Sequence, residues 1–309
     1  MTTGLATRRL GTAARRQLAW RAFTTIGLGF TAPLVGSLIV TDRCNLACRH
    51  CAVANIRRVD YLFRRLRQDL KSLYAQGVRI VLLYGGEPML WHEGDRTLAD
   101  VVEEARLIGF PVVGVVTNGT RGVDLPDADI VLVSLDGTRE HHDAIRGAGF
   151  DRVLANIAAA TTRNLCLSMA VNRVNVDDVE YVAGLTRSLP AVRGVSYNVH
   201  TPYPGTEDLS LSDEQRGDVC RRVRRLIRQG YPVLNFASAM GRIADFSAPR
   251  PCPQCVLVED GEQWVCGRCR DVPGLCDRCG FFFASELSLL FRGDPRVLFE
   301  ALRRYRTFL

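Results

Sequence analysis

Residues 37–51 read Ser-Leu-Ile-Val-Thr-Asp-Arg-Cys-Asn-Leu-Ala-Cys-Arg-His-Cys, a strand-like run that leads directly into three cysteines. These are Cys44, Cys48 and Cys51, separated by three and then two residues. Three thiolates on one tight loop can bind three irons of a cubane cluster and leave the fourth iron open to a ligand. The stretch therefore predicts a catalytic 4Fe–4S site at the end of a strand. The alternative is a zinc knuckle with His50 as the fourth ligand.

Beyond this loop, short β-branched runs alternate with longer helical patterns, which is typical of parallel strands joined by crossover helices. Strands are expected near residues 37–41, 78–84, 111–117, 130–135, 165–172 and 192–199. Helices are expected near residues 61–76, 98–108, 152–162, 176–188 and 213–229, the last with Ser212 as its N-cap. The predicted fold class is α/β, a partial (β/α)6 TIM-like barrel. A doubly wound sheet is the alternative that fits the same alternation.

Three more short motifs follow predicted strands, in the order in which the strands occur. They are Gly85-Gly86-Glu87-Pro88 after the second strand, Val116-Thr117-Asn118-Gly119 at the end of the third and Ser134-Leu135-Asp136-Gly137 at the end of the fourth. Parallel α/β sheets and barrels bind ligands at the C-terminal ends of their strands. Each motif alone is weak, since an Asn-Gly pair is commonly just a turn. Their joint order predicts one ligand site together with the cysteine loop.

Over roughly residues 37–199, the cysteine loop and these motifs together resemble the radical S-adenosylmethionine (SAM) superfamily, and residues 139–149 resemble the loop after its fourth strand. The resemblance implies that SAM chelates the open iron and is cleaved by one electron to a 5′-deoxyadenosyl radical. This radical then takes hydrogen from an unactivated carbon. A flavodoxin- or ferredoxin-type reductant is implied as well. The residues implied as SAM contacts are Gly85, Gly86, Glu87, Thr117, Asn118, Ser134 and Asp136.

The fifth predicted strand adds three candidate residues. Period-two alternation puts Cys166 and Asn172 on one face of this strand, so Cys166 faces the cofactor if Asn172 does. A thiol there could donate a hydrogen atom to a substrate radical, and the alternative is a small buried apolar residue. Arg173 is a candidate partner of the SAM carboxylate, with a surface position as the alternative.

Six further cysteines lie close together near the end of the chain. They form three Cys-x-x-Cys pairs, namely Cys252 and Cys255, Cys266 and Cys269, and Cys276 and Cys279. Such clustering indicates metal binding, and so short a segment needs metal or disulfides to fold. Cys255, Gly261 and Cys266 resemble the opening of the SPASM and twitch auxiliary-cluster domains, from which the later spacing departs. We predict one auxiliary 4Fe–4S cluster with four of the six thiolates, and a zinc ribbon is the alternative.

Three segments are expected: an N-terminal basic and hydrophobic arm (residues 1–36), the barrel (37–248), and a metal-stabilised module with a closing helix near residues 294–306 (249–309). The arm has five arginines before an uncharged run over residues 22–41. Glycines and a proline interrupt this run, so a membrane-spanning helix is not expected. An amphipathic helix over residues 8–23 is expected instead, packed on the protein's own core or on a membrane surface.

The net charge of +7 comes almost wholly from arginine, since Lys71 is the only lysine. Dispersed arginines usually form a solvated surface. No stacking aromatic residues alternate with them near the cysteine pairs, so no nucleic-acid partner is expected. Clustered free cysteines indicate a reducing compartment, and we expect a cytoplasmic protein, with peripheral membrane contact through the arm as an option.

The sequence thus predicts a radical SAM enzyme. The expected substrate is a small molecule, a sugar or a lipid-like compound, because the arm is short for a separate peptide-recognition domain. A radical SAM/SPASM peptide maturase is the main alternative. A non-catalytic iron–sulfur or zinc-binding protein, such as an electron carrier or a nucleic-acid module, is a further one.

Overall fold

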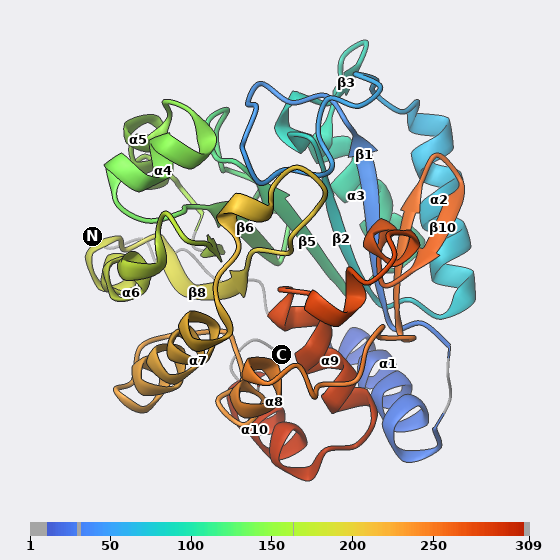
Figure 1. The fold of residues 1–309 in the computed structure, drawn as a ribbon. Helices are drawn as coiled ribbons and strands as arrows, with labels where there is room; N and C mark the ends of the chain where they lie inside the picture. Colours follow the sequence, from blue (N-terminus) through green and yellow to red (C-terminus); the bar gives the residue numbers. More distant parts are fainter. Residues whose placement is uncertain (1–10, 30–31, 163, 306–309) are drawn as a thin grey trace, which may run out of the picture.

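The protein, seen here as a computed structural model that describes residues 11–29, 32–162 and 164–305, is built on one curved eight-stranded sheet (Figure 1). The strand order is β10-β9-β1-β2-β5-β6-β7-β8. Six adjacent strands of this sheet are parallel: β1 (Val35–Thr41), β2 (Ile80–Gly85), β5 (Val112–Thr117), β6 (Ile130–Ser134), β7 (Leu165–Val171) and β8 (Val192–Val199). These strands follow one another in chain order without a reversal, which confirms the partial barrel and excludes a doubly wound sheet.

The helices predicted between the strands are present. They are α2 (Phe63–Gln76), α3 (Leu98–Ile108), α5 (Phe150–Ala158), α6 (Val179–Ser188) and α7 (Asp213–Arg228), and Figure 1 shows them around the outside of the sheet. Ser212 caps α7 as predicted, in a reciprocal capping box with Gln215. One helix between the six parallel strands was missed: α4 (Arg139–Arg146) lies in the expected loop 139–149, where its His142 and Ile145 are buried.

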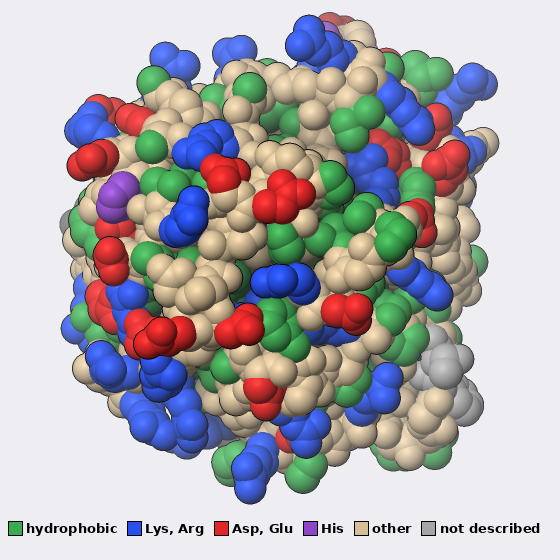
Figure 2. All heavy atoms as spheres, viewed as in Figure 1, with side chains coloured by type: hydrophobic (Ala, Val, Ile, Leu, Met, Phe, Trp, Pro, Cys, Tyr) green, Lys and Arg blue, Asp and Glu red, His purple; other side chains and the backbone are tan. Residues whose placement is uncertain are grey.

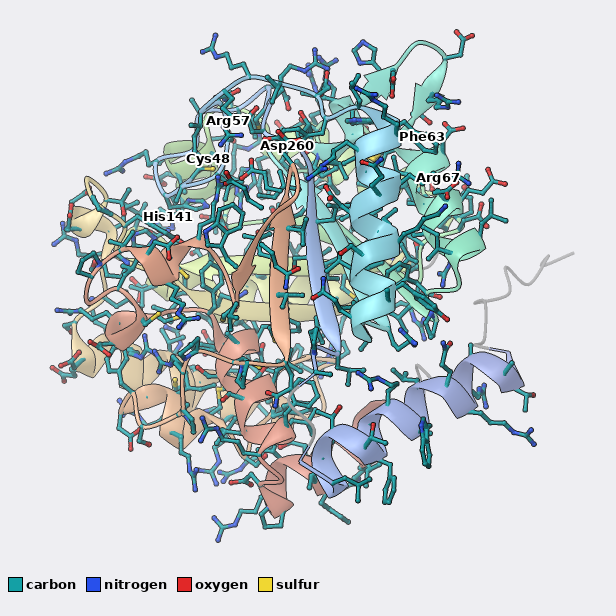
Figure 3. All side chains as sticks on the ribbon, turned by 90° about the vertical axis from the view of Figure 1, so that its right-hand side faces the viewer. Cys48, Arg57, Phe63, Arg67, His141 and Asp260 are labelled. Atoms are coloured by element: carbon teal, nitrogen blue, oxygen red, sulfur yellow. The ribbon has the colours of Figure 1, made fainter. Side chains whose placement is uncertain are left out.

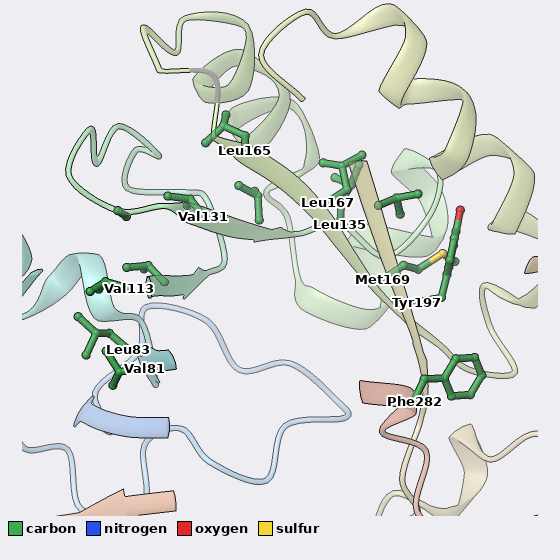
Figure 4. Packing of buried hydrophobic residues seen from close by; sticks show 14 of the residues in the cluster. Val81, Leu83, Val113, Val131, Leu135, Leu165, Leu167, Met169, Tyr197 and Phe282 are labelled. Atoms are coloured by element: carbon green, nitrogen blue, oxygen red, sulfur yellow. The ribbon is translucent and has the colours of Figure 1, made fainter. Parts of the chain in front are cut away.

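The main core lies between the sheet and these helices. Figure 4 shows Val81 and Leu83 of β2, Val113 of β5 and Val131 of β6 packed in one layer. Each of these side chains is fully buried, and full burial of a Val or Leu contributes about 1.5–3 kcal/mol. This packing holds the strand ends, and the loops that leave them, in fixed relative positions.

The C-terminal segment closes the open side of the barrel. Its hairpin β9 (Cys255–Glu259) and β10 (Glu262–Val265) was not predicted, and β9 pairs in parallel with β1. At the opposite edge, Gly280 accepts a hydrogen bond from the Val199 amide at 2.9 Å. A Cβ on Gly280 would lie 1.8 Å from the Val199 carbonyl oxygen, so only glycine fits there. The segment also contains α8 (Met240–Ala244) before the hairpin, α9 (Phe282–Phe291) and the predicted closing helix, α10 (Pro295–Tyr305).

The described part of the N-terminal arm packs on the protein itself. It forms α1 (Thr12–Ala22) and a π-helical turn, and Leu18 is buried in a small cluster with Leu34, Val35, Cys252, Cys255 and Phe291. Apolar residues are not gathered on one face of α1, so the predicted amphipathic helix is wrong in that respect, and residues 8–10 of that prediction lie outside the described residues. Within the described ranges, none of the helices is both long and apolar enough to cross a membrane.

Candidate functional site

The site begins with the loop between β1 and α2, which carries Cys44, Cys48 and Cys51; Figure 3 labels Cys48 on this loop. Each thiol receives a hydrogen bond from a nitrogen, a contact that stabilises the thiolate form and tunes iron–sulfur centres. These contacts run from the Leu46 amide to Cys44 Sγ at 3.4 Å, from the Ala54 amide to Cys51 Sγ at 3.3 Å and from Arg146 Nη1 to Cys48 Sγ at 4.0 Å. Cys44, Cys48 and Cys51 therefore fit the requirements of a cluster site.

Burial acts on these thiols in the absence of metal. It raises the pKa of Cys48 to about 11, although the nearby Arg146 guanidinium opposes the rise. Burial also raises the pKa of Cys44. Binding of a metal centre must therefore displace protons from both thiols, which couples assembly of the centre to pH.

Buried polar side chains fix the shape of the cysteine loop. Asp42 is 1 % exposed, and its carboxylate accepts hydrogen bonds from the amides of Arg57, Arg58 and Val59. Asn55 accepts one from the Cys44 amide at 3.0 Å and donates one to the Leu46 carbonyl at 3.1 Å. The two ends of the loop are thus tied together through side chains, and the loop is preformed.

The turn after β2 touches this loop backbone to backbone. The Gly86 amide donates to the Thr41 carbonyl at 2.8 Å, and the Glu87 amide donates to the Arg43 carbonyl at 2.9 Å. Gly85 has a φ of +147°, and a Cβ there would lie 2.0 Å from the Thr41 oxygen. A Cβ on Gly86 would lie 2.3 Å from the Arg43 oxygen. Glycine at both positions is required for this approach.

Glu87 connects the turn to the end of β5. Its carboxylate is fully buried and accepts hydrogen bonds from Thr117 Oγ1 and from the Asn118 amide, both at 2.6 Å. Burial raises the pKa of Glu87, although these hydrogen bonds oppose the rise. Asn118 Nδ2 in turn lies 3.7 Å from Cys44 Sγ. Three predicted site residues therefore meet beside the cysteine loop.

Asp136 and Arg146 form a buried ion pair beneath the loop. Arg146 Nε lies 2.6 Å from Asp136 Oδ2, and the Ala170 amide donates to Asp136 Oδ1 at 2.8 Å. Burial alone would raise the pKa of Asp136, but Arg146 and the other neighbours outweigh it and hold this pKa below its usual value. His50 Nε2 is 3.8 Å from the same carboxylate. Arg146 lies in residues 139–149 and had no predicted role, because sequence order does not show which carboxylate it meets.

The other predicted site residues, Ser134, Asn172, Arg173 and Cys166, have no described contact with the cysteine loop. Ser134 ends β6 and is partly exposed. Asn172 is fully buried, but its side chain bonds to the backbone of its own turn at Ala170 and Val174. The Arg173 side chain is exposed, which agrees with the alternative of a surface position rather than with a partner of the SAM carboxylate. Cys166 is buried at the N-terminal end of β7, away from the strand ends that carry the site, so its position does not support the predicted hydrogen-donor role.

The C-terminal cysteines begin beside the N-terminal end of β1, where Cys255 pairs with Val35. Cys252 Sγ and Cys255 Sγ lie 3.1 Å apart, and the Cys255 thiol's hydrogen bond lowers the pKa of Cys252. Burial raises the pKa of Cys266 to about 12, and the neighbouring thiols of Cys279, Cys252 and Cys269 add to the rise. Cys266 therefore lies between two groups of thiols.

The second group of thiols lies near tyrosines. The Tyr203 hydroxyl is hydrogen-bonded to Cys269, which also lies near Cys276 and Cys279. Tyr84, at the end of β2, lies near Cys266 and Cys269. All eleven cysteines of the chain are free thiols, and in the described residues no three His, Cys, Asp or Glu side chains are grouped as ligands of a single metal ion.

Comparisons with known proteins give a family model and several curated relatives that this chain resembles. Residues 38–186 match the model of the radical SAM superfamily. The chain is 28% identical to Fe-coproporphyrin III synthase of Methanosarcina barkeri over 217 residues, which is 63% of this chain and 52% of that protein. It is 32% identical to mycofactocin maturase MftC of Mycobacterium ulcerans over 189 residues, 54% of this chain and 50% of that protein. The chain thus spans about half the length of these curated relatives.

Two further comparisons cover more of the chain. GTP 3′,8-cyclase of Geobacter sulfurreducens is 29% identical over 296 residues, 86% of this chain and 87% of that protein. The crystal structure of Streptococcus suis SuiB bound to the precursor peptide SuiA has a TM-score of 0.61 at 13% identity, over 92% of this chain and 70% of that one. At this identity the structural likeness shows a shared fold.

Proposed function

Because the chain belongs to the radical SAM superfamily, whose enzymes use a 4Fe–4S cluster and SAM, we propose that Cys44, Cys48 and Cys51 bind this cluster and that SAM occupies the adjoining turn of Gly85, Gly86 and Glu87. The observation that carries the assignment is the preformed β1–α2 loop. Each of its thiols Cys44, Cys48 and Cys51 accepts a hydrogen bond from a nitrogen, and its backbone packs closely against Gly85 and Gly86. When bound, the cluster supplies the electron that cleaves SAM into methionine and a 5′-deoxyadenosyl radical.

In this proposal the residues around the cluster position the cysteine loop and SAM. Gly85 and Gly86, which have no side chain, would let the backbone of the turn approach the amino group of SAM. Glu87 fixes this turn against Thr117 and Asn118. Asp136 and Arg146 hold α4 against the barrel and supply the donor to Cys48. Preorganised donors of this kind orient a cofactor without further reorganisation.

The C-terminal thiols are proposed to hold an auxiliary 4Fe–4S cluster, which is typical of relatives such as MftC. Cys266 has Cys252 and Cys255 as neighbours on one side and Cys269 and Cys279 on the other, and the ligands of the cluster would come from these thiols. Tyr84 lies between these thiols and the Gly85 turn, because it precedes that turn and neighbours Cys266 and Cys269. We place the substrate on this side of the barrel, between the two proposed centres.

A small-molecule substrate remains the first candidate. Two relatives, named as Fe-coproporphyrin III synthase and GTP 3′,8-cyclase, support it, and the second matches over most of this chain. A maturase role is the second candidate, because mycofactocin maturase MftC is 32% identical over its matched half. A cell extract that contains the substrate should stimulate 5′-deoxyadenosine formation. If the stimulation survives protease digestion of the extract, a small-molecule substrate is favoured; if digestion abolishes it, a peptide substrate is favoured.

Metal analysis tests the assignment of the cysteines. Replacing Cys44, Cys48 and Cys51 by alanine should remove about four irons per chain from anaerobically reconstituted protein. The matched variant Cys252→Ala/Cys255→Ala/Cys266→Ala should keep those irons and lose the auxiliary set. Circular dichroism of the apoproteins would control for folding. Unchanged iron in the first variant would contradict the assignment, and zinc in place of the auxiliary iron would make the C-terminal centre structural.

A further inference from the structure

Two arginine side chains contact the backbone of the last cysteine pair. Arg216 Nη2 donates to the Cys279 carbonyl at 3.2 Å, and Arg250 Nη1 donates to the same carbonyl at 3.0 Å. Arg250 Nη1 also donates to the Cys276 carbonyl at 3.3 Å. Both guanidinium groups face the ring of Phe246, with their Cζ atoms 3.7 Å and 5.5 Å from its centroid. Two positive charges therefore converge on this cysteine pair.

Both charges are shielded from water. Arg216 is 3% exposed, and Nε and Nη2 of Arg250 are buried without a hydrogen-bond partner in the described part of the chain. Figure 2 shows the usual arrangement for comparison: basic side chains lie at the surface, many of them close to Asp or Glu side chains. A buried cation is normally paired with an anion, because desolvation of an unpaired charge is strongly unfavourable.

No carboxylate supplies this anion among the described residues. There, both guanidinium groups donate to backbone carbonyls, and neither forms an ion pair with Asp or Glu. Burial lowers the pKa of Arg216 to about 10. The groups that oppose this shift most are the thiols of Cys220 and Cys279, with Asp213 after them. Burial raises the pKa of Cys220 to about 12, so Cys220 stays neutral and Cys279 is left as the neighbour that can become an anion.

The space beside Arg216 is too small for a bound anion. The cavity that Arg216 lines with His200 and Ser210 has a volume of about 20 Å³. This is room for a single water molecule rather than for a carboxylate or a phosphate group. The thiols around Cys279 can supply the missing negative charge instead, because thiols that bind a metal do so as thiolates.

We propose that Arg216 and Arg250 are the counter-cations of the auxiliary 4Fe–4S cluster and raise its reduction potential. The inference rests on the auxiliary cluster proposed above, with Cys279 among its ligands. The reduction potential of such clusters depends on net charge, hydrogen bonding and burial. Reduction adds one negative charge to the cluster, so two nearby cations favour the reduced state. Both arginines are positioning residues, since they act on the cluster and not on a substrate.

The alternative is a structural role, in which the two side chains only satisfy carbonyl groups at the short turn Cys276–Arg278. Glutamine distinguishes the two roles, because its amide can still donate to a carbonyl but carries no charge. Lysine keeps the charge but lacks the planar fork of donors. A structural role therefore predicts that lysine and glutamine act alike, whereas the counter-cation role predicts that only glutamine changes the potential.

A redox titration followed by electron paramagnetic resonance tests the proposal. The parent is the full-length, anaerobically reconstituted Cys44→Ala/Cys48→Ala/Cys51→Ala protein, in which only the auxiliary cluster gives a signal. Arg216→Gln and Arg250→Gln should each make reduction roughly tenfold less favourable, which lowers the midpoint potential by about 59 mV for one electron. Arg216→Lys and Arg250→Lys should stay close to the parent. Arg250 is only partly buried, so its variants remain informative if Arg216→Gln does not fold.

Arg222→Gln on the same helix, α7, is the matched control. Arg222 is 13% exposed, but it is paired with Glu180 of α6, so its replacement should leave the midpoint potential unchanged. Circular dichroism of the apoproteins checks folding. Parent-like potentials in both glutamine variants, or equal shifts in the lysine variants, would overturn the counter-cation role alone. Iron analysis reports on the proposed function separately: a parent protein without iron would refute the auxiliary cluster, and the counter-cation role with it.

Discussion

Replacement of Gly86 by alanine is expected to lower the rate of SAM cleavage at least about 100-fold, because displacements of about 1 Å in a catalytic site cost this much. The added Cβ would lie 2.3 Å from the Arg43 carbonyl oxygen and 2.5 Å from that of Asp42. Both obstacles are backbone atoms of the cysteine loop, and Asp42 anchors this backbone firmly. Either the turn or the loop must move, and the thiols move with the loop.

Dithionite-driven formation of 5′-deoxyadenosine measures this effect, and chemical unfolding of the apoprotein should show a loss of about 1–3 kcal/mol from the strained packing. Gly184→Ala on α6 is the matched control, since nothing lies within 4 Å of its added Cβ. That variant should keep full activity and gain about 0.5–1 kcal/mol, as expected for a helical glycine. Wild-type activity in Gly86→Ala would show that the contact between turn and loop is unimportant.

Removal of the Arg146 side chain should be the most destabilising single change at the site. Arg146→Ala leaves the fully buried Asp136 carboxylate without its main cation, and breaking such a pair costs about 3–5 kcal/mol. Arg139→Ala, on the same helix, breaks a pair with Asp151 in which both side chains are more than half exposed. Its expected cost is below about 1 kcal/mol. Urea unfolding of the two apoproteins compares them directly.

The pH dependence gives a second readout of the same pair. In wild type the pKa of Asp136 is held low, so its stabilising contribution is present at neutral pH and is lost as pH falls through that lowered value. In Arg146→Ala, burial should raise this pKa, and protonation on lowering the pH then relieves the buried charge. The deficit relative to wild type should therefore shrink towards acid pH. A deficit that is small, or independent of pH, would argue against the ion pair's importance.

Much of the site could be predicted because its signals are local. The spacing of Cys44, Cys48 and Cys51 is set by the geometry of one loop. Gly85 and Gly86 are required by the geometry of one turn. The hairpin β9–β10 was missed although Asp260-Gly261, both with positive φ, is a typical hairpin turn. The cysteine pairs on either side of it directed the interpretation towards metal binding.

Other features depend on contacts that sequence order does not reveal. Alternation along β7 predicts which face of the strand carries Cys166. It does not show that Cys166 lies at the N-terminal end of β7, which decides whether its thiol can reach a ligand at the strand ends. The packing of α4 against the barrel brings Arg146 to Asp136. β9 pairs with β1, although more than 200 residues separate them in the sequence. Arg173 follows a buried turn and nevertheless extends outward. These are tertiary outcomes, and the structure is needed to place them.

The proposal on which the others depend is that Cys44, Cys48 and Cys51 make this chain a SAM-cleaving enzyme. Its most direct test is the formation of 5′-deoxyadenosine and methionine from SAM by anaerobically reconstituted, dithionite-reduced protein, measured by mass spectrometry in wild type and in the triple alanine variant. We expect both products from wild type and none above background from the variant. Equal product from the two proteins, or none from wild type that contains its full complement of iron, would contradict it.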